Sequence, residues 1–483
     1  MLKSVLKKEA LRLETLEEAQ LIIEKLCEIV RDMAARIEDL EEQIGRGSGN
    51  SSQPPSQDSA KQRAERKKKK PSGRKQGAQP GHRKHQREFV PEDQVNGVER
   101  FYPAGRCSCG GTIEPEAEPS QRHQVFDLPE VRYTVTEYQS YSGSCRRCRT
   151  HHVAELPSWV PRGQMGAGLI SWITLLSGQY QVTTRAVQSL LREQWDLAFS
   201  LGAISQAQRP VSTWLEPIYA QIGESVRQSK VAHADETSHY RGAERRWLWA
   251  LCMPTAVYFL THYSRGKGAA NELLQDFDGI LISDRHGGYN DYPIERRQLC
   301  WAHILRNLEC IAGRSGRAGK LGRRLVRLAQ LTVRLEHRWR GGGYGSILYE
   351  HRLHRLRAWF RRELEHGACA HRNSRTGNQC SKLLREESML WTFLSHPGIP
   401  LTNNAAERAL RPYVIWRKIS FFSQSYRGDQ FRPLILSITE TCKRLQVGAY
   451  KILRRACEQG LRGEPVTVRL PIPNAQPTLA LPA

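Results

Sequence analysis

The sequence predicts a multidomain α/β protein in which a mixed sheet is flanked by helices and carries an all-helical insertion. Three observations support this prediction. Short apolar runs bounded by Gly, Asn and Pro follow one another between residues 230 and 302. A strongly basic pattern with helical periodicity covers residues 314–396. A heptad pattern and two cysteine pairs precede the apolar runs, which indicates smaller modules in front of the sheet.

Length, charge and cysteine usage limit the possible classes of function. A chain of 483 residues has room for about three domains. Its 73 Lys and Arg against 49 Asp and Glu give a formal net charge of +24, which favours a polyanionic partner, with nucleic acid as the first candidate. No run approaches the roughly 18 apolar residues of a membrane span, and the charged N-terminus does not resemble a signal peptide. We therefore expect a cytoplasmic protein without a membrane partner, whose paired cysteines indicate metal rather than disulfides.

The first 45 residues are expected to form a coiled-coil dimerisation arm. Glu and Lys or Arg flank most positions of an apolar seam with alternating steps of three and four. The seam comprises Leu16, Ala19, Ile23, Leu26, Val30, Met33, Ile37, Leu40 and Ile44. An amphipathic helix packed on its own domain is the alternative, but the Gly- and Ser-rich sequence that follows favours a free-standing arm that self-associates.

Residues 46–100 are predicted to be a flexible basic linker. It contains the run Arg66, Lys67, Lys68, Lys69 and Lys70, and it has no apolar face on which to fold. A charge run of this kind is often only a solvated segment. Its position between an arm and a metal module favours contacts with DNA phosphates that do not depend on base sequence.

Two cysteine pairs indicate a small zinc-ribbon-like module over residues 101–155. Cys107 and Cys109 stand beside two glycines, Cys145 and Cys148 have the common two-residue spacer, and the sequence between the pairs alternates like strands. We expect the four thiolates to bind Zn²⁺, with His151 or His152 as a possible substitute ligand. The alternative is four unligated cysteines, because the first pair has a spacer of only one residue.

Residues 160–228 are expected to be helical. The segment from Val182 to Gln208 predicts a helix, a turn around Gly202 and a second helix, which is compatible with a DNA-binding helix-turn-helix. Most short helix pairs only contribute to a core, so this pattern alone does not establish DNA binding.

From Lys230 the sequence becomes strand-like. Residues 231–235 are predicted to be a strand that ends in Asp235, residues 245–264 a hairpin, and residues 268–277 a helix. The run 280–283 is a buried strand that ends at Asp284, and Gln298–Trp301 is a further strand before a helix. If the strands that end in the two aspartates are neighbours, their carboxylates converge at one edge. A single Asp in this position is more often a turn or N-cap residue, so partner carboxylates have to be found.

A third acid, Glu407, follows the basic helical insertion. Asn403 or Asn404 is a natural N-cap for a helix that carries it, and Pro412 is expected to end that helix soon after. The chain then predicts one amphipathic helix and a loose tail over its last 20 residues. Together, Asp235, Asp284 and Glu407 satisfy the need of phosphodiester cleavage for two Mg²⁺ ions. Spacing alone leaves other acids available, namely Glu236, Asp278, Asp291 and Glu440.

Several ordered motifs resemble those of the insertion-sequence-66 family of transposases. They are GRKQGAQPGH, the double cysteine knuckle, HADET at 233–237, LISDRHGGYN, QLCWAH followed by ILRN, and LTNNAAERALRP with RKIS behind it. The resemblance runs from the N-terminal arm to the C-terminal helices. It implies a ribonuclease-H-like catalytic core of the DDE type, in which two Mg²⁺ or Mn²⁺ ions are held by an acidic triad.

The resemblance also assigns individual residues. Asp235 of HADET takes the first acidic position, Asp284 of ISDRH the second, and Glu407 of NNAAERALRP the third. Cys300 and His303 match a motif whose role is structural or DNA-positioning, with direct metal ligation as an alternative. Two departures stand out: the family usually has two residues within the first knuckle, and the bulkier FFSQSYRGDQ replaces a Gly- and Ser-rich turn after RKIS.

The implied activity is that of a bacterial insertion-sequence transposase that binds terminal inverted repeats, cleaves a strand and transfers it to target DNA. Arg408 and Arg411 are expected to face phosphates, with surface salt bridges as the alternative. Expected partners are a second copy of the chain, as a homodimer or higher oligomer, and small accessory proteins of the same element. The protein would be nucleoid-associated when bound. The competing readings are a structure-specific nuclease or resolvase with the same core, and a non-catalytic DNA-binding regulator.

These inferences divide the chain into eight segments. The expected boundaries are 1–45 for the arm, 46–100 for the linker, 101–155 for the cysteine module, 160–228 for the helical region, 229–312 for the first part of the catalytic core, 313–398 for the insertion, 399–445 for the second part of the core with the third acid, and 446–483 for the C-terminal helix and tail.

Overall fold

The computed structural model describes residues 20–30, 33, 81, 88–103, 105–114, 116–128, 133–157, 159–343 and 345–473. The chain divides into two compact units, of which the smaller is Ala64–Thr136 and the larger contains Glu137–Ala483. Residues 20–30 are helical, in agreement with the heptad pattern. Apart from Met33, the rest of the predicted arm lies outside the described residues, as does the basic run Arg66–Lys70. None of the described helices combines the length and the apolar composition needed to cross a lipid bilayer.

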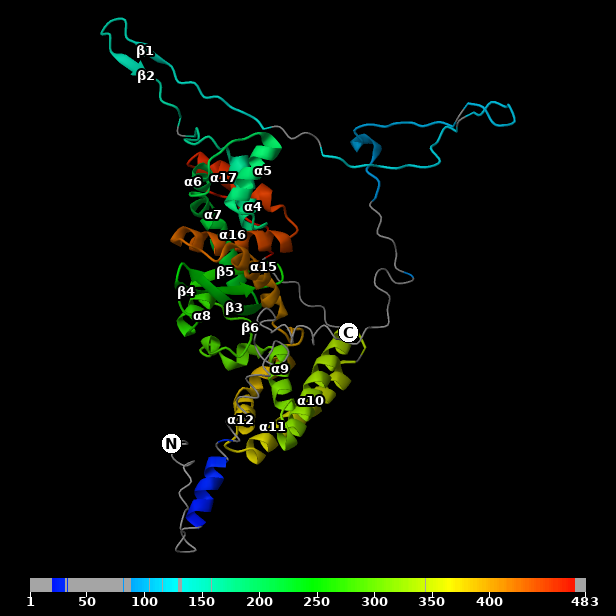
Figure 1. Cartoon of the computed structure of the whole chain (residues 1–483), viewed down its shortest axis with the longest axis vertical. Helices are drawn as coiled ribbons and strands as arrows, with labels where there is room; N and C mark the ends of the chain where they lie inside the picture. The colour runs from blue at the N-terminus through cyan, green and yellow to red at the C-terminus, as the bar shows by residue number, and fades with distance from the viewer. Residues whose placement is uncertain are drawn as a thin grey trace, which may run out of the picture. The chain divides into compact units, whose positions relative to one another are not determined.

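A five-stranded mixed sheet forms the centre of the larger unit (Figure 1). Its strands are β3 (Val231–Arg241), β4 (Glu244–Cys252), β5 (Val257–His262), β6 (Ile280–Ser283) and β7 (Arg297–Leu299), in the order β5-β4-β3-β6-β7. The first three pair antiparallel, whereas β6 runs parallel to both β3 and β7. The predicted α/β class is therefore confirmed, as is the hairpin of residues 245–264.

The first strand is longer than the sequence predicts. We expected it to end at Asp235, but β3 continues to Arg241 and pairs with β4 over its whole second half. That half is polar, and its polar groups find partners on distant helices. Arg417 donates to the Thr237 hydroxyl at 2.7 Å and to the Ser238 carbonyl, and His239 lies between Asp429 and Tyr413. Tertiary partners thus sustain a strand that hydrophobic patterning cannot detect.

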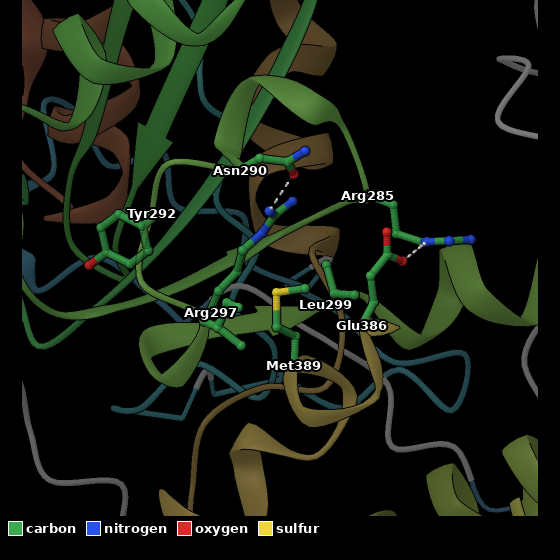
Figure 2. A pocket seen from close by; sticks show the side chains of 8 residues that line it. Arg285, Asn290, Tyr292, Arg297, Leu299, Glu386 and Met389 are labelled. Carbon is green, nitrogen blue, oxygen red and sulfur yellow. Dashed lines mark hydrogen bonds and ion pairs between the residues drawn. The ribbon is translucent and has the colours of Figure 1, made fainter. Parts of the chain in front are cut away.

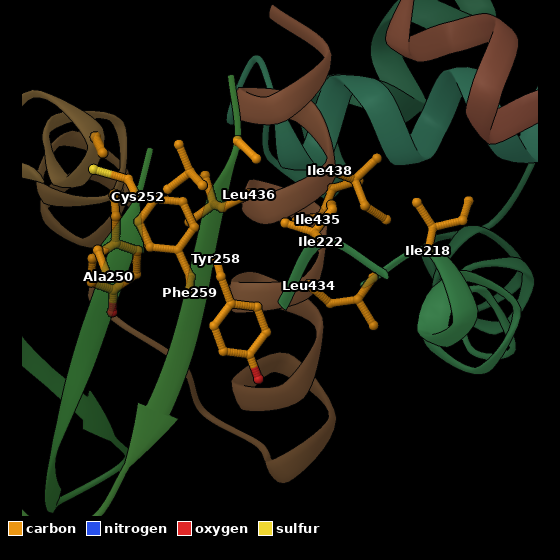
Figure 3. Packing of buried hydrophobic residues seen from close by; sticks show 14 of the residues in the cluster. Ile218, Ile222, Ala250, Cys252, Tyr258, Phe259, Leu434, Ile435, Leu436 and Ile438 are labelled. Atoms are coloured by element: carbon orange, nitrogen blue, oxygen red, sulfur yellow. The ribbon is translucent and has the colours of Figure 1, made fainter. Parts of the chain in front are cut away.

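Two helices cover the free edge of the sheet. α7 (Val211–Arg227) and α16 (Tyr426–Arg444) both pack against β5. The Thr441 hydroxyl accepts the Val257 N–H at 3.1 Å, and the Ser437 hydroxyl accepts the Phe259 N–H at 2.9 Å. Figure 3 shows apolar side chains of α7 and α16 facing β4 and β5. The edge strand, which would otherwise offer its backbone to another chain, is satisfied internally.

The helical region before the sheet is confirmed, but its turn is not where we expected it. It contains α4 (Ala167–Gly178), α5 (Thr184–Trp195), α6 (Leu201–Ala207) and α7. The turn between α5 and α6 begins at Asp196, which adopts the left-handed conformation, and the Ser200 hydroxyl caps α6, so Gly202 lies inside a helix. Val187, Leu191 and Ile204 are buried in the same core as the sheet.

The predicted insertion is helical throughout its main elements. α9 (Trp301–Ala312) leads into α10 (Gly316–Arg340), α11 (Ser346–Ala370), α12 (Arg375–Arg385), α13 (Glu387–Leu390) and α14 (Thr392–Ser395). A second apolar core holds these helices together, with Trp301, Phe360 and Trp391 fully buried in mutual edge-on contact. The Trp301 indole N–H donates to the Leu390 carbonyl at 2.9 Å, which ties the insertion to the end of β7.

The C-terminal part differs from the prediction in three respects. α15 (Asn404–Ser420) continues through Pro412, because Tyr413 and Arg417 beyond the proline bond to β3. The single amphipathic helix is two helices, α16 and α17 (Ala449–Leu461), separated by Gln446 in the left-handed conformation. The expected loose tail is packed as far as Ile472: Leu470 and Ile472 are buried, and the Leu470 backbone exchanges two hydrogen bonds with the Gln221 side chain.

Candidate active site

Asp235 lies on β3, and Asp284 directly follows the neighbouring strand β6. β3 and β6 are parallel, with His233 opposite Ile282. Continuing this register by two residues, one residue past the end of β6, places Asp235 opposite Asp284. The strands approach closely at the start of β6, where a side chain on Gly279 would lie 2.5 Å from the Ser229 carbonyl oxygen. The expected convergence of these two carboxylates therefore follows from the pairing register.

Helix α15 delivers Glu407 to the same end of the sheet. The helix packs against β3 and β4, and Glu407 lies in its first turn. Asn403, which is fully buried, fixes this turn because its amide donates to the Ala234 carbonyl at 2.7 Å. Of the two expected N-cap residues, Asn403 and Asn404, Asn403 is the N-cap, but its side chain does not cap the helix and its backbone carbonyl accepts the Ala406 and Glu407 N–H groups. The side chain instead links α15 to the residue before Asp235.

The surroundings of Asp235 disfavour the ionised form of its carboxyl. Burial raises the pKa of the Asp235 carboxyl well above its usual range, and the carboxylates of Glu236, Asp284 and Glu407 raise it further. One hydrogen bond, from the Glu236 N–H at 2.9 Å, acts in the opposite direction. All three predicted acids keep partial solvent exposure. Partly exposed carboxylates that repel each other form a place where a cation is stabilised.

The segment after Asp284 is held by a buried arginine. Asp284 accepts the His286 N–H at 2.8 Å, and the Arg297 guanidinium bonds to the carbonyls of Asp284, His286 and Tyr289 and to the side chains of Ser283 and Asn290. Arg297 also lines a cavity of about 170 Å³, together with Arg285 and Glu386. The Arg285 guanidinium donates to the Glu386 carboxylate at 2.6 Å (Figure 2). Sequence reasoning missed Arg297, because a buried arginine that bonds to backbone carbonyls has no motif.

The four acids that spacing left available have other surroundings. Glu236 is buried, accepts two hydrogen bonds from Arg265 at 2.8 and 2.9 Å, and accepts the Tyr289 hydroxyl at 2.8 Å. Asp291 pairs with Lys267 at 2.5 Å, and Asp278 is 86% exposed. Glu440 lies on α16, where burial raises the pKa of its carboxyl and the charges of Lys443 and Arg444 lower it. Only Glu236 is close to the cluster, and it is already paired.

Cys300 and His303 contact the third acid and its helix. The buried Cys300 sulfur accepts the Asn403 N–H at 3.1 Å. His303 Nε2 lies 3.7 Å from a Glu407 oxygen, and burial together with the Arg306 charge lowers the pKa of its imidazole, which favours the neutral form. Arg306, one helical turn further along α9, lies 3.6 Å from the same oxygen. The spacing of three between His303 and Arg306 is a helical-face signal that could have identified Arg306.

Arg408 and Arg411 are exposed on α15 next to Glu407. Within the part of the chain that the structure describes, neither forms a salt bridge, so the alternative of surface salt bridges is not supported for them. Burial lowers the pKa of the His233 imidazole, and the charges of Arg444 and Arg408 lower it further.

Comparison with known families now adds to this geometry. Residues 162–430 match a family model described as "Transposase IS66 family", which covers more than half of the chain. The chain belongs to the IS66 transposase family. The matched span includes Asp235, Asp284 and Glu407 as well as Cys300 and His303. Residues 7–88 match a second model, a family of unknown function named DUF6444.

Two relatives of this IS66-family transposase occur in Sinorhizobium fredii strain NBRC 101917 / NGR234. Uncharacterized protein y4hP is 23% identical over 381 residues, covering 71% of this chain and 68% of the relative. Uncharacterized protein y4qI is 26% identical over 261 residues, and each chain is covered to 47%. The chain thus spans about half the length of y4qI. These names add no activity to the family assignment.

The cysteine pairs of the transposase lie outside the family match. Each pair occupies a tight turn: the Gly110 N–H donates to the Cys107 carbonyl, and the Arg149 N–H to the Cys145 carbonyl. The second turn joins β1 (Ser142–Ser144) and β2 (His151–Val153), whereas residues 133–141, which we expected to be strand-like, pair with no strand among the described residues.

Metal ligation by either set of residues is not visible in the side-chain arrangement. Among the described parts of the chain, no group of three or more His, Cys, Asp or Glu side chains is arranged to hold a metal ion. All four cysteines are free thiols. The hydrogen bonds of Thr150 lower the pKa of the Cys148 thiol to about 7, which favours the thiolate that metals bind.

Proposed function

We propose that this chain is a DDE-type transposase with a ribonuclease-H-like core, which cleaves DNA at the ends of its element and joins them to target DNA. The observation that carries the proposal is the pairing register that sets Asp235 opposite Asp284, with Glu407 held at the same end through Asn403. Membership of the IS66 transposase family supports it, as does a mixed sheet whose adjacent strands β3 and β6 bring the first two acids together.

The donor set fits divalent cations of the hard type. Asp235 and the two partly exposed carboxylates of Asp284 and Glu407, which raise its pKa, together provide oxygen ligands and excess negative charge. Asp235, Asp284 and Glu407 would hold two Mg²⁺ or Mn²⁺ ions, which when bound supply charge neutralisation at the attacking and leaving oxygens. Glu407 is now directed toward His303 and Arg306, and these two residues would keep its helix turn oriented.

The protein residues have distinct parts in the proposed reaction. Asn403 and Arg297 position the segments that carry Glu407 and Asp284, and the exposed Arg408 and Arg411 would contact phosphates beside them. Water would hydrolyse a strand at the end of the element, and the freed 3′-hydroxyl would then attack a target phosphodiester without a covalent protein intermediate. The arm over residues 1–45 would pair two copies of the chain on two terminal repeats, with accessory proteins of the element as further partners.

The test uses the variants Asp235→Asn, Asp284→Asn and Glu407→Gln in full-length protein. Each is expected to lose Mg²⁺-dependent cleavage of DNA that carries the terminal repeats while it still binds that DNA in EDTA. Asp291→Asn, which alters a surface acid paired with Lys267, is the matched control and should cleave normally. Intact cleavage in one of the three variants would remove that residue from the site.

A pre-cleaved end separates the proposed activity from its alternatives. The wild-type protein should join such an end to target DNA, whereas a structure-specific nuclease or resolvase would cut branched DNA without joining. A non-catalytic DNA-binding regulator would show neither reaction, and its function would survive all three substitutions.

Zinc binding by Cys107, Cys109, Cys145 and Cys148 is a separate part of the proposal. The tight turns that carry both pairs and the lowered pKa of the Cys148 thiol support it. Metal analysis of purified protein should find zinc that is lost when the cysteines are replaced by serine. Protein that contains no zinc would contradict this part and leave the acidic site unaffected.

A further inference from the structure

One side of α15 presents positive charges and apolar side chains to solvent. From the third acid onward, its exposed residues follow one another at steps of three and four, so they share one side of the helix. We call this set of residues the α15 face, and it comprises Arg408, Arg411, Ile415, Lys418 and Ile419. The only acid in α15 is Glu407, which directly precedes the α15 face.

The charges of the α15 face are all positive and are not offset by acids. Among the residues that the structure describes, none of Arg408, Arg411 and Lys418 forms a salt bridge. Arg417, the other basic residue of the helix, is used for structure, because its guanidinium bonds to β3. The face extends about 20 Å along the helix axis beyond the third acid. A polyanion that leaves the acidic site along α15 would therefore meet only cations on this helix.

The helix ends at two phenylalanines with a strained backbone. Phe421 and Phe422 both adopt the left-handed conformation, with φ of 51° and 66°, which favours glycine and disfavours bulky side chains. The turn lets the following Ser423 reach β3, where its N–H donates to the Tyr240 carbonyl at 3.1 Å. Phe422 gains packing in return, since its ring lies edge-on to the Tyr240 ring at 4.9 Å between centroids.

Phe421 gains no comparable packing. Its side chain is 79% exposed, so the residue combines a disfavoured backbone conformation with little burial. Glycine at this helix end would be the more stable choice. Ile415 and Ile419, on the last two turns of the same helix, are also 49% and 52% exposed. A bulky ring that the fold disfavours and the core does not use indicates a role at the surface.

We propose that the α15 face binds a single strand of DNA, with phosphates on Arg411 and Lys418 and an unpaired base stacked on Phe421. Sites for single strands combine a row of cations with exposed aromatic rings in this way. The bases of a duplex stack on one another, so a duplex would use the cations and leave the ring without a partner. The inference rests on the proposed function only in that the strand belongs to the DNA on which the transposase acts.

The first experiment follows the fluorescence of a 12-nucleotide oligothymidine with one central 2-aminopurine, added to the full-length protein in EDTA so that no cleavage occurs. Stacking on Phe421 should quench the base analogue. Phe421→Gly should weaken the affinity of the quenching transition by about five- to 150-fold, because one stacked base contributes about 1–3 kcal/mol. Phe421→Trp should keep it. Tyr263→Ala removes another exposed ring, after the edge strand β5, and should quench like wild type.

The stability of the same variant separates recognition from a structural role. Phe421→Gly relieves the left-handed backbone, so its urea midpoint should be at least that of wild type while the quenching is lost. A phenylalanine that stabilised the turn would instead lower the midpoint when replaced. That result, with quenching retained, would contradict the proposal.

The cations have their own readout. Arg411→Gln/Lys418→Gln should reduce the slope of log affinity against log salt by about 1.4, because two phosphate contacts with a single strand are lost. Arg361→Gln/Arg454→Gln removes the same charge elsewhere, from two exposed arginines that each pair with a glutamate four residues further along. The slope of this control should match that of wild type.

Three results would overturn the proposal. Phe421→Gly could quench like wild type, or it could lose as much affinity for polyglutamate as for the oligothymidine, which would assign the face to an acidic protein. Sedimentation could also show that Phe421→Gly only dissociates an oligomer and binds the oligothymidine normally, which would assign the face to contacts between copies. Asp284→Asn should lose cleavage and keep the quenching, so failure of cleavage in all proteins would count against the proposed function alone.

Discussion

Asp235 and Glu236 are consecutive acids on β3, and their side chains point to opposite faces of the sheet. On one face, Asp235 is partly exposed and meets the charges of Asp284 and Glu407. On the other face, Glu236 is buried, and Arg265 and Tyr289 satisfy both of its oxygens. Burial and the charge of Asp284 raise the pKa of Glu236 as well, so the two acids differ mainly in that Glu236 has a paired cation, Arg265.

The difference separates an acid that stabilises the fold from acids that are available for a ligand. Glu236 connects β3 to the 3-10 helix η3 (Gly287–Tyr289), which follows Asp284, so its charge is used for structure. Among the residues that the structure describes, no salt bridge to Asp235 offsets the neighbouring carboxylates. Such an arrangement destabilises the folded chain until a cation binds. Four substitutions test this contrast between the two faces.

Glu236→Gln is expected to have the largest effect on stability, a loss of about 3 kcal/mol, because it leaves a buried amide facing the donors of Arg265 and Tyr289. Denaturation by urea in EDTA measures the change. Tyr289→Phe, which removes one of the hydrogen bonds, should cost about 1 kcal/mol. Equal stability of Glu236→Gln and wild type would show that the paired acid does not hold the Asp284 segment.

Asn403→Ala should cost about 2 kcal/mol, because it leaves the buried Ala234 carbonyl without its donor and loosens the first turn of α15. Cleavage should fall about tenfold or more even where the variant is fully folded, since Glu407 loses its fixed position. The exposed neighbour Asn404 provides the control, and Asn404→Ala should leave cleavage and the urea midpoint close to wild type. Equal effects of the two substitutions would contradict a positioning role for Asn403.

The main elements of the sheet could be predicted from sequence because their signals are local. The apolar runs of β4, β5 and β6, and the periodic apolar positions of the insertion, need no knowledge of distant partners. The second half of β3 and the continuation of α15 through Pro412 could not be predicted. Both depend on contacts between β3 and helices about 180 residues away, such as the bond from Arg417 to Thr237.

The candidate site divides in the same way. Aspartates that follow apolar runs are visible in the sequence, and so Asp235 and Asp284 were identified together with Glu407. Glu236 and Asp291 are excluded from the site because each is paired with a cation. Arg265 pairs with Glu236 from 29 residues away along the chain, and Lys267 pairs with Asp291 from 24 residues away. Sequence spacing cannot show which acids already have a cation, and this information decides which carboxylates remain available.

Asp235→Asn should act in the opposite direction from Glu236→Gln and stabilise the metal-free protein by about 1 kcal/mol. The folded-state pKa of Asp235 is raised, so the wild-type chain loses stability as the pH rises from the ordinary carboxyl range through that pKa. The asparagine variant does not titrate, and its advantage should grow over the same pH range and disappear at lower pH. Urea midpoints in EDTA at several pH values measure it, and an advantage that is independent of pH would contradict the assigned repulsion.

Asp278→Asn should have the smallest effect, within about 0.5 kcal/mol of wild type, because exposed charges of this kind contribute little. Asp278 is 86% exposed, and its contact with Arg296 is 3.9 Å long. It nevertheless lies six residues before Asp284 in the sequence and was an equally acceptable acid by spacing. Cleavage assays beside those of Asp284→Asn measure the difference between the two. If Asp278→Asn also lost cleavage, exposure and pairing would not be what distinguishes the acids of the site from the other acids of the sheet.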